Sequence, residues 1–382
     1  MSFHAQIFYD NNPNGVYYAG QVLSGRVEVS LTKAKKLRSL YMTVNGKAET
    51  SWNETESYTD HEGKSQTRTV HYGAEETYLN SVTYLVGSEQ GSEVQLESGK
   101  HIYNFMCALP ALLPCSYEGG TGFVRYTIKV TLDRPWKFDQ TSKAAFTVIS
   151  PLDLNLDPRY RLPVSRESTK TLWCGCSTKP MRVNVELPRT GYAPGEEIAV
   201  TCNVSNETRV DVEYLHIKIT KIAKFHSRSP HKIKHSSTDL VTVSAEGVPR
   251  YTKTSITRNI QLPVIPPSLL HNCSIIDIDY VIKVKASIPG CHRSMRLELP
   301  FTVGTVPLSN RPEQPEIGFA NVAPSAPPIT AQPGAGAPND DLPPSYEECM
   351  FGAQSIRDNN DSQYTIGFQN FTPLYPVYNS KQ

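Results

Sequence analysis

Residues 124–132 read Val-Arg-Tyr-Thr-Ile-Lys-Val-Thr-Leu, so that apolar and polar side chains alternate along the stretch. A period of two puts all the apolar side chains on one face of an extended strand, as in a half-buried antiparallel sheet. The same alternation runs through residues 23–31 and 276–286, and no segment of helical length has a clean 3.6-residue apolar stripe. Many strands separated by turns are typical of a β-sandwich or barrel, so we predict an all-β fold.

These stretches belong to an internal repeat. Four segments return in the same order: residues 17–23 as 192–198, Leu109-Pro110 as Leu262-Pro263, residues 125–130 as 279–284, and residues 146–148 as 301–303. Each copy needs a core of its own, so the repeat predicts two similar tandem sandwiches. We place the first over residues 1–150 and the second over residues 179–307. The Pro-rich segment 151–178 is the predicted linker, in which the alternation of Leu152, Leu154 and Leu156 predicts a short strand.

The remaining segment, residues 308–382, has a different composition. The last 76 residues hold 12 of the 29 prolines, with 3 Lys and Arg against 8 Asp and Glu. Such a segment cannot bury enough apolar surface to offset the entropy lost on ordering, so we predict a disordered tail.

The tail contains the tetrapeptide Pro343-Pro344-Ser345-Tyr346, which matches the PPxY pattern that WW domains bind. Consecutive prolines favour a polyproline II helix, so that little entropy is lost when the segment docks in an aromatic groove. The tyrosine ring supplies a large anchor with a polar tip. We therefore assign Pro343, Pro344, Ser345 and Tyr346 as the WW-domain-binding residues.

Two further tail motifs are candidates. Pro324-Ser325-Ala326-Pro327 matches the P(S/T)AP pattern that ESCRT-I binds, although such tetrapeptides arise easily in a Pro-rich segment. Pro373, Leu374 and Tyr375 form a candidate weaker WW site, because Thr372 stands where a PPxY motif has its first proline. Two sites on one tail would raise the avidity for a partner with several WW domains.

Compartment and chemistry follow from what the chain contains. The segment that begins with Met1 has neither a basic start nor an apolar run, and the formal net charge is +1, so we expect a cytoplasmic protein that does not bind nucleic acid. No catalytic, phosphate-binding or metal-ligand motif is present, so we predict no enzymatic activity, no cofactor and no metal site. Cys174 and Cys176 are ordinary thiols, or lipid-modified if the protein reaches a membrane. The basic run of residues 218–235 is a solvated hairpin or a contact for anionic lipids.

Taken together, the residues resemble those of the alpha-arrestin (arrestin domain-containing) family. The resemblance covers residues 1 to about 308 and the tail motifs, and it is carried by these stretches: residues 18–27, 45–48, Trp52, 125–130, 132–136, 191–196 and 304–308. It implies two arrestin-like (immunoglobulin-like) sandwiches joined by a short hinge, with no catalysis.

The resemblance also implies partners. Proteins of this kind bind a membrane receptor or transporter as cargo and recruit a HECT-type ubiquitin ligase by PPxY–WW contacts. The ubiquitinated cargo is then endocytosed or sorted, which implies recruitment to the plasma membrane and endosomes. The alternative is an arrestin-fold scaffold that sorts cargo without ubiquitin, or a vesicle-budding adaptor that acts through ESCRT-I.

Overall fold

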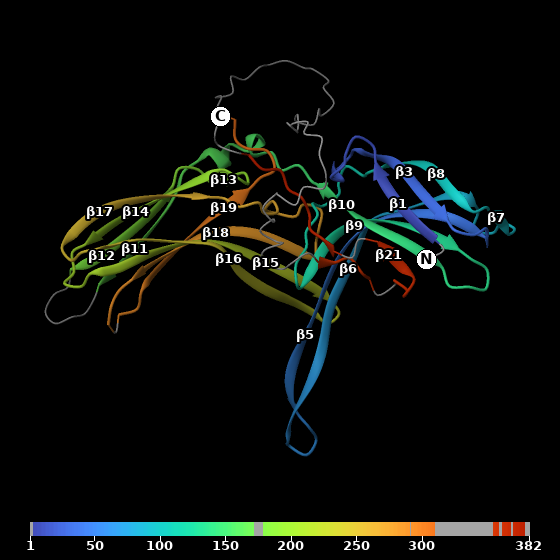
Figure 1. Ribbon diagram of the computed structural model, residues 1–382. Helices are drawn as coiled ribbons and strands as arrows, with labels where there is room; N and C mark the ends of the chain where they lie inside the picture. Colours follow the sequence, from blue (N-terminus) through green and yellow to red (C-terminus); the bar gives the residue numbers. More distant parts are fainter. Residues whose placement is uncertain are drawn as a thin grey trace.

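The computed structural model describes residues 3–171, 179–290, 292–309, 354–358, 361–367 and 370–378. Two β-sandwiches lie end to end, the first in blue and cyan and the second in green to orange (Figure 1). No α-helix occurs within these ranges. The short 3₁₀ helices that do occur there are not long and apolar enough to cross a membrane. The prediction of two tandem sandwiches is confirmed.

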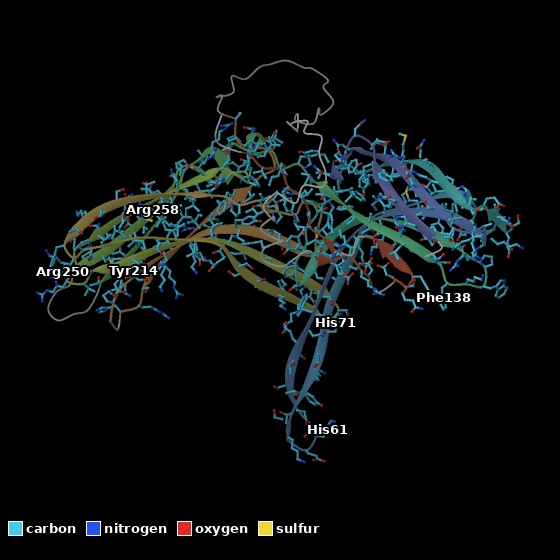
Figure 2. All side chains as sticks on the ribbon, in the orientation of Figure 1. His61, His71, Phe138, Tyr214, Arg250 and Arg258 are labelled. Atoms are coloured by element: carbon cyan, nitrogen blue, oxygen red, sulfur yellow. The ribbon has the colours of Figure 1, made fainter. Side chains whose placement is uncertain are left out.

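The N-terminal sandwich contains two main sheets. The smaller has the order β1-β3-β8, with strands Phe3–Tyr9, Val22–Leu31 and Gly99–Ala108. The larger has the order β2-β10-β9-β5-β6, with strands Val16–Tyr18, Gln140–Ile149, Gly122–Asp133, Ser39–Thr59 and Ser65–Gly87. A small ribbon pairs β4 (Lys35–Leu37) with β7 (Val94–Leu96). The far half of the β5–β6 hairpin projects away from both sandwiches, with His61 near its tip (Figures 1 and 2).

The C-terminal sandwich has the same plan. One sheet has the order β11-β12-β14-β17, with strands Val164–Thr171, Pro180–Leu187, Glu197–Asn206 and Thr252–Gln261. The other has the order β13-β19-β18-β15-β16, with strands Gly191–Tyr192, Met295–Val303, Ile276–Ser287, Val212–Arg228 and His231–Val248. β11 pairs with β12 along its whole length, so this sheet begins within the segment expected to be a linker.

The alternating side chains form the cores as predicted. Every apolar side chain at the even positions from Val124 to Leu132 is fully buried, and those from Ile276 to Ala286 are buried likewise. The tyrosine in each stretch is held in the same way: Tyr126 donates a hydrogen bond to the Pro114 carbonyl, and Tyr280 donates one to the Pro266 carbonyl, both at 2.7 Å. Burial of a phenol requires such a partner, so the repeat extends to its polar details.

The short strand predicted over residues 152–156 is wrong. Two 3₁₀ helices stand there, η1 (Leu154–Leu156) and η2 (Pro158–Arg161). Asp153 caps η1 by accepting the backbone N–H two residues ahead at 2.8 Å, and Asp157 does the same for η2 at 2.9 Å. Aspartate caps therefore outweigh a short alternation, since they satisfy backbone donors that nothing else would bind.

The described parts of the tail differ from the expectation of disorder. They contain β20 (Gln354–Ser355), β21 (Thr365–Gly367) and β22 (Asn370–Phe371), drawn in red beside the N-terminal sandwich in Figure 1. β21 runs parallel to β10, with Thr365 opposite Thr141 and Gly367 opposite Lys143. The tail thus gains backbone partners and buried charges from the folded body, which its composition alone does not reveal.

Candidate functional site

The candidate binding motifs of the tail fall into two groups. Pro343, Pro344, Ser345 and Tyr346, and likewise Pro324, Ser325, Ala326 and Pro327, lie outside the described residues, as do Cys174 and Cys176. Pro373, Leu374 and Tyr375 are described, and they lie against the body of the protein. The site is therefore built from this last motif and from the tail residues before it.

Tyr375 is held in the N-terminal sandwich. Its ring is only 8% exposed, and its hydroxyl donates a hydrogen bond of 2.9 Å to the Ser116 carbonyl. The backbone N–H of Leu374 donates to the Thr147 hydroxyl at 3.2 Å, while the Leu374 side chain points outward and is 45% exposed. Pro373 is buried as well. The two side chains that a WW domain would grip are thus the two that the protein covers.

The same segment continues onto the C-terminal sandwich. The Tyr378 N–H donates to the Pro194 carbonyl at 2.8 Å, and the Tyr378 hydroxyl donates to the Thr305 carbonyl at 2.6 Å. Burial raises the pKa of the Tyr378 hydroxyl to about 12, so it stays protonated as a donor at any physiological pH. We name residues 371–378 the clasp, because they bind both sandwiches.

Gly195 lets the clasp approach closely. Its φ of +90° is a conformation that suits glycine, and a Cβ at this position would collide with the Tyr378 carbonyl oxygen and the Val377 side chain. The equivalent glycine of the first repeat, Gly20, has a φ of +88°, yet a Cβ there would meet only Ala111 at 3.7 Å. The turn is shared by both repeats, but only the second is covered by the tail.

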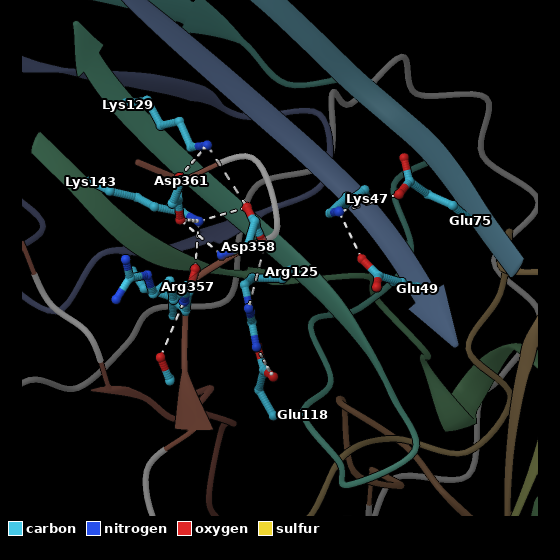
Figure 3. Close-up of polar contacts among 12 residues, drawn as sticks. Lys47, Glu49, Glu75, Glu118, Arg125, Lys129, Lys143, Arg357, Asp358 and Asp361 are labelled. Carbon is cyan, nitrogen blue, oxygen red and sulfur yellow. Dashed lines mark hydrogen bonds and ion pairs between the residues drawn. The ribbon is translucent and has the colours of Figure 1, made fainter. Parts of the chain in front are cut away.

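Two tail aspartates form ion pairs with the N-terminal sheet (Figure 3). Lys143 of β10 donates to Asp358 at 2.6 Å, to Asp361 at 2.9 Å and to the Ile356 carbonyl at 2.5 Å. Lys129 of β9 contacts the other oxygen of Asp361 at 2.7 Å. We name Asp358 and Asp361 the acidic pair. The ammonium group of Lys143 has all three of its protons matched to acceptors, as a buried cation requires.

Burial makes this contact sensitive to its partners. The side chains of Lys143 and Asp361 are 3% and 2% exposed. Burial acts to raise the pKa of the Asp361 carboxyl, but the Asp358 backbone N–H, Lys129 and Lys143 outweigh it, and the pKa lies below its ordinary value. Removing one partner of such a pair typically costs about 3–5 kcal/mol, because the other charge stays buried and unpaired.

Arg125 differs from its expected position. The alternation placed its side chain opposite the apolar core, yet it is only 5% exposed. Its guanidinium forms two hydrogen bonds with Glu118, at 2.6 and 2.7 Å, lies 4.0 Å from the centre of the Phe123 ring, and comes within 3.9 Å of Asp358. The polar face of β9 is therefore covered by a loop and by the tail rather than by solvent.

The basic run from Lys218 to His235 lies in the β15–β16 hairpin, and several of its charges are paired. Lys232 contacts Glu54 at 2.7 Å and Arg228 contacts Glu76 at 2.6 Å, both across the boundary between the sandwiches. The Thr50 hydroxyl also donates to the His226 carbonyl at 2.7 Å. This part of the hairpin therefore serves as an inter-domain contact.

The cysteines within the described ranges are free thiols. Cys107, Cys115 and Cys202 are buried and Cys273 is partly buried. Burial raises the pKa of Cys115 to about 12 and that of Cys202 to about 11, which keeps both protonated and unreactive. No group of three His, Cys, Asp or Glu side chains comes together within the described residues in a way that could hold a metal ion.

The fold and the site define a protein of tandem arrestin domains, and comparison with known proteins agrees. The family model described as "Arrestin (or S-antigen), N-terminal domain" matches residues 5–155, and "Arrestin (or S-antigen), C-terminal domain" matches residues 177–308. The chain belongs to the arrestin domain-containing family, the alpha-arrestins, as the sequence motifs indicated.

Several curated relatives share most of this chain. Arrestin domain-containing protein 17 of Caenorhabditis elegans is 29% identical over 309 residues, which cover 78% of this chain and 69% of the relative. Arrestin domain-containing protein 4 of Mus musculus is 28% identical over 79% of this chain and 72% of its own. Arrestin domain-containing protein 1 of Homo sapiens is 26% identical over 85% and 72%. Membership of this family suggests an adaptor role, and arrestin-family proteins are generally non-catalytic.

Proposed function

We propose that the chain is a non-catalytic adaptor that links membrane cargo to a HECT-type ubiquitin ligase through WW domains. The cargo, a receptor or transporter, would be ubiquitinated and then endocytosed and sorted at endosomes. The observation that carries the proposal is the presence of Pro343-Pro344-Ser345-Tyr346 in a chain whose body consists of two arrestin domains. A body without a catalytic motif and a tail with a ligand motif are the two parts that an adaptor needs.

In this proposal the two ends of the chain do different work. The sandwiches engage the cargo, and the tail holds the ligase at high effective concentration beside it. The protein is cytoplasmic and associates with the plasma membrane and endosomes through its partners.

The proposal is tested by calorimetric titration of a WW-domain array into the purified full chain, beside a Tyr346→Ala variant. We expect micromolar binding by the natural chain and a loss of at least about tenfold in the variant, because the tyrosine ring is the main anchor. Equal binding by the two chains would move the contact away from Tyr346. No binding by either would leave an arrestin-fold scaffold that sorts cargo without ubiquitin.

A second candidate function rests on Pro324, Ser325, Ala326 and Pro327, which match an ESCRT-I ligand. In this case the chain would act in vesicle budding. Replacing Pro324, Ser325 and Pro327 by alanine should then reduce vesicle release while leaving WW-domain binding unchanged, and unchanged release would exclude this role.

A further inference from the structure

We propose that the clasp is a masked WW-domain site, and that a WW domain which binds Tyr375 also detaches the clasp from both arrestin domains. The inference rests on the proposed function for the class of partner. It assigns to Pro373, Leu374 and Tyr375 a closed state, in which the motif is unreadable, and an open state, in which it binds.

The closed state follows from what the motif contacts. A WW domain grips the proline and tyrosine rings of an extended ligand, so both rings must leave any other surface first. In this chain Pro373 is buried, Tyr375 is 8% exposed, and the Tyr375 hydroxyl is bonded to the Ser116 carbonyl. The same atoms cannot serve the sandwich and a WW groove at once, so the two modes of binding exclude each other.

The contacts of the clasp nevertheless allow it to dissociate from the sandwiches. Its described residues after Phe371 form no strand with the body, and the Leu374 and Val377 side chains are 45% and 48% exposed. Hydrogen bonds from the segment to the sandwiches are donated by Leu374, by Tyr375 and twice by Tyr378. Tyr375 packs into the apolar core, whereas the Leu374 and Val377 side chains remain half exposed, so we infer that the clasp can open without unfolding either sandwich.

Release of the clasp affects both domains, because its contacts are divided between them. Ser116 and Thr147 belong to the N-terminal sandwich, whereas Pro194 and Thr305 belong to the C-terminal one. Once the segment leaves, contacts such as Lys232 with Glu54, Arg228 with Glu76 and Ser274 with Glu76 still link the two sandwiches. WW binding is thereby coupled to the hinge between the domains.

A ligase bound at the first WW site, Tyr346, would favour opening of the clasp. Tyr346 lies 27 positions before Pro373 in the sequence. A ligase that holds Tyr346 with one WW domain presents its next WW domain to the clasp at a high effective concentration. The closed state lowers the apparent affinity of Tyr375 in proportion to the fraction of open molecules, and the tethered WW domain offsets this penalty. The chain would thus engage one WW domain first and a second only by opening.

The test compares variants that lack the first site, so that binding reports on the clasp alone. Tyr346→Ala is combined with Tyr378→Ala, which removes clasp contacts without changing the sequence from Thr372 to Tyr375. We expect the double variant to bind a WW-domain array at least about tenfold more tightly than Tyr346→Ala alone. Tyr346→Ala with Tyr378→Phe, which removes only the hydroxyl bond to Thr305, should give a smaller gain in the same direction.

Two controls accompany these variants. Tyr346→Ala with Tyr364→Ala changes a tail tyrosine that lies outside the clasp and is 38% exposed, and it should bind as Tyr346→Ala does. Tyr346→Ala with Tyr375→Ala should not bind. Thermal unfolding of every variant verifies that both sandwiches are folded.

Hydrogen exchange supplies a second readout. The amides of Leu374 and Tyr378 should be protected in the natural chain and lose protection when the WW-domain array is added. A synthetic peptide of residues 368–381 should bind the array as tightly as the opened chain.

The proposal is overturned if the peptide binds but Tyr378→Ala gives no gain over the Tyr364→Ala control, since the site would then be unmasked. It is equally overturned if the peptide does not bind at all. Either failure is distinct from failure of the adaptor function, which is measured on the chain with Tyr346 intact.

Discussion

The cores of the two sandwiches are built in the same way, but the sandwiches differ at one edge of a sheet. In each, a buried tyrosine ring packs against the equivalent phenylalanine of its repeat. The ring centroids of Tyr126 and Phe146 are 5.8 Å apart, and those of Tyr280 and Phe301 are 5.9 Å apart. A serine completes both copies, because the Ser116 and Ser268 hydroxyls each accept a strand N–H at 2.9 Å. The same contacts therefore stabilise the fold in both copies, since each satisfies a buried polar group that the fold creates.

The edge that differs is the one that receives the tail. Lys143 on β10 faces Lys129 across the ladder, and the equivalent position on β19 is Glu298, which faces Lys283. Arg125 likewise corresponds to Asp279, one position before the core tyrosine in each copy. The N-terminal edge therefore has three cations where the C-terminal edge has one cation and two carboxylates. This difference explains why the acidic pair of the tail docks on only one of two similar domains.

The largest effect is expected from making the N-terminal edge resemble its counterpart with Lys143→Glu. The new carboxylate would face both members of the acidic pair, so docking of residues 354–367 should be lost, a change of about 3–5 kcal/mol. Hydrogen exchange of the β21 amides and limited proteolysis of the tail measure this.

Glu298→Lys is the matched control for that exchange. The side chain is exposed on the sheet of the other sandwich, so we expect a change in stability within about 0.5 kcal/mol and no change in tail protection. Unaltered protection of β21 in Lys143→Glu would show that charge does not decide where the tail docks.

A smaller effect is expected from acid. The pKa of Asp361 is lowered on docking, so its contribution is complete well above the ordinary value of 3.8 and is lost as the pH falls through the lowered pKa. Tail protection should thus persist at neutral pH and decline under strongly acidic conditions. Asp361→Asn should weaken docking at neutral pH and flatten this dependence, and a profile as steep as that of the natural chain would assign it to another group.

The smallest effect is expected in the shared core. Tyr126→Phe and Tyr280→Phe each remove a buried hydroxyl from a proline carbonyl, at a cost of about 1–2 kcal/mol in the free energy of unfolding. We expect the two values to agree, because both bonds measure 2.7 Å. Urea denaturation measures them, with Tyr251→Phe as the exposed control. A large difference would mean that the two cores are less alike than their geometry indicates.

Much of this architecture could be predicted from the sequence. Alternation located the core strands because a period of two is a local property, and the repeat located two domains because each copy buries the same tyrosine and phenylalanine. Membership of the arrestin family followed from short stretches such as residues 191–196, where the shape of a turn fixes the residue types.

The docked tail could not be predicted in this way. Asp358 and Asp361 look like solubilising charges in a polar segment, and their partner Lys143 is more than 200 positions away. The exposure of Arg125 was predicted wrongly for the same reason, since the alternation of apolar and polar residues predicts exposure only where the face opposite the core meets water. The feature that indicates an acidic partner is the group of cations at one edge of the sheet. It can be recognised only once the fold brings Lys129 and Lys143 together.

The projecting β5–β6 hairpin has a consequence for how the molecule moves. Near Gly46 the ribbon is flanked by β9, and a Cβ at that glycine would strike the Tyr126 ring, so the base is clamped by the core. Beyond Glu54, which contacts Lys232, the two strands pair with each other from Thr55 and Thr69 to the tip, and an isolated two-stranded ribbon is marginally stable in water. The hairpin should therefore fray progressively from the end that carries His61 while its base stays closed, so that a single pair of strands spans the range from the most to the least rigid part of the domain.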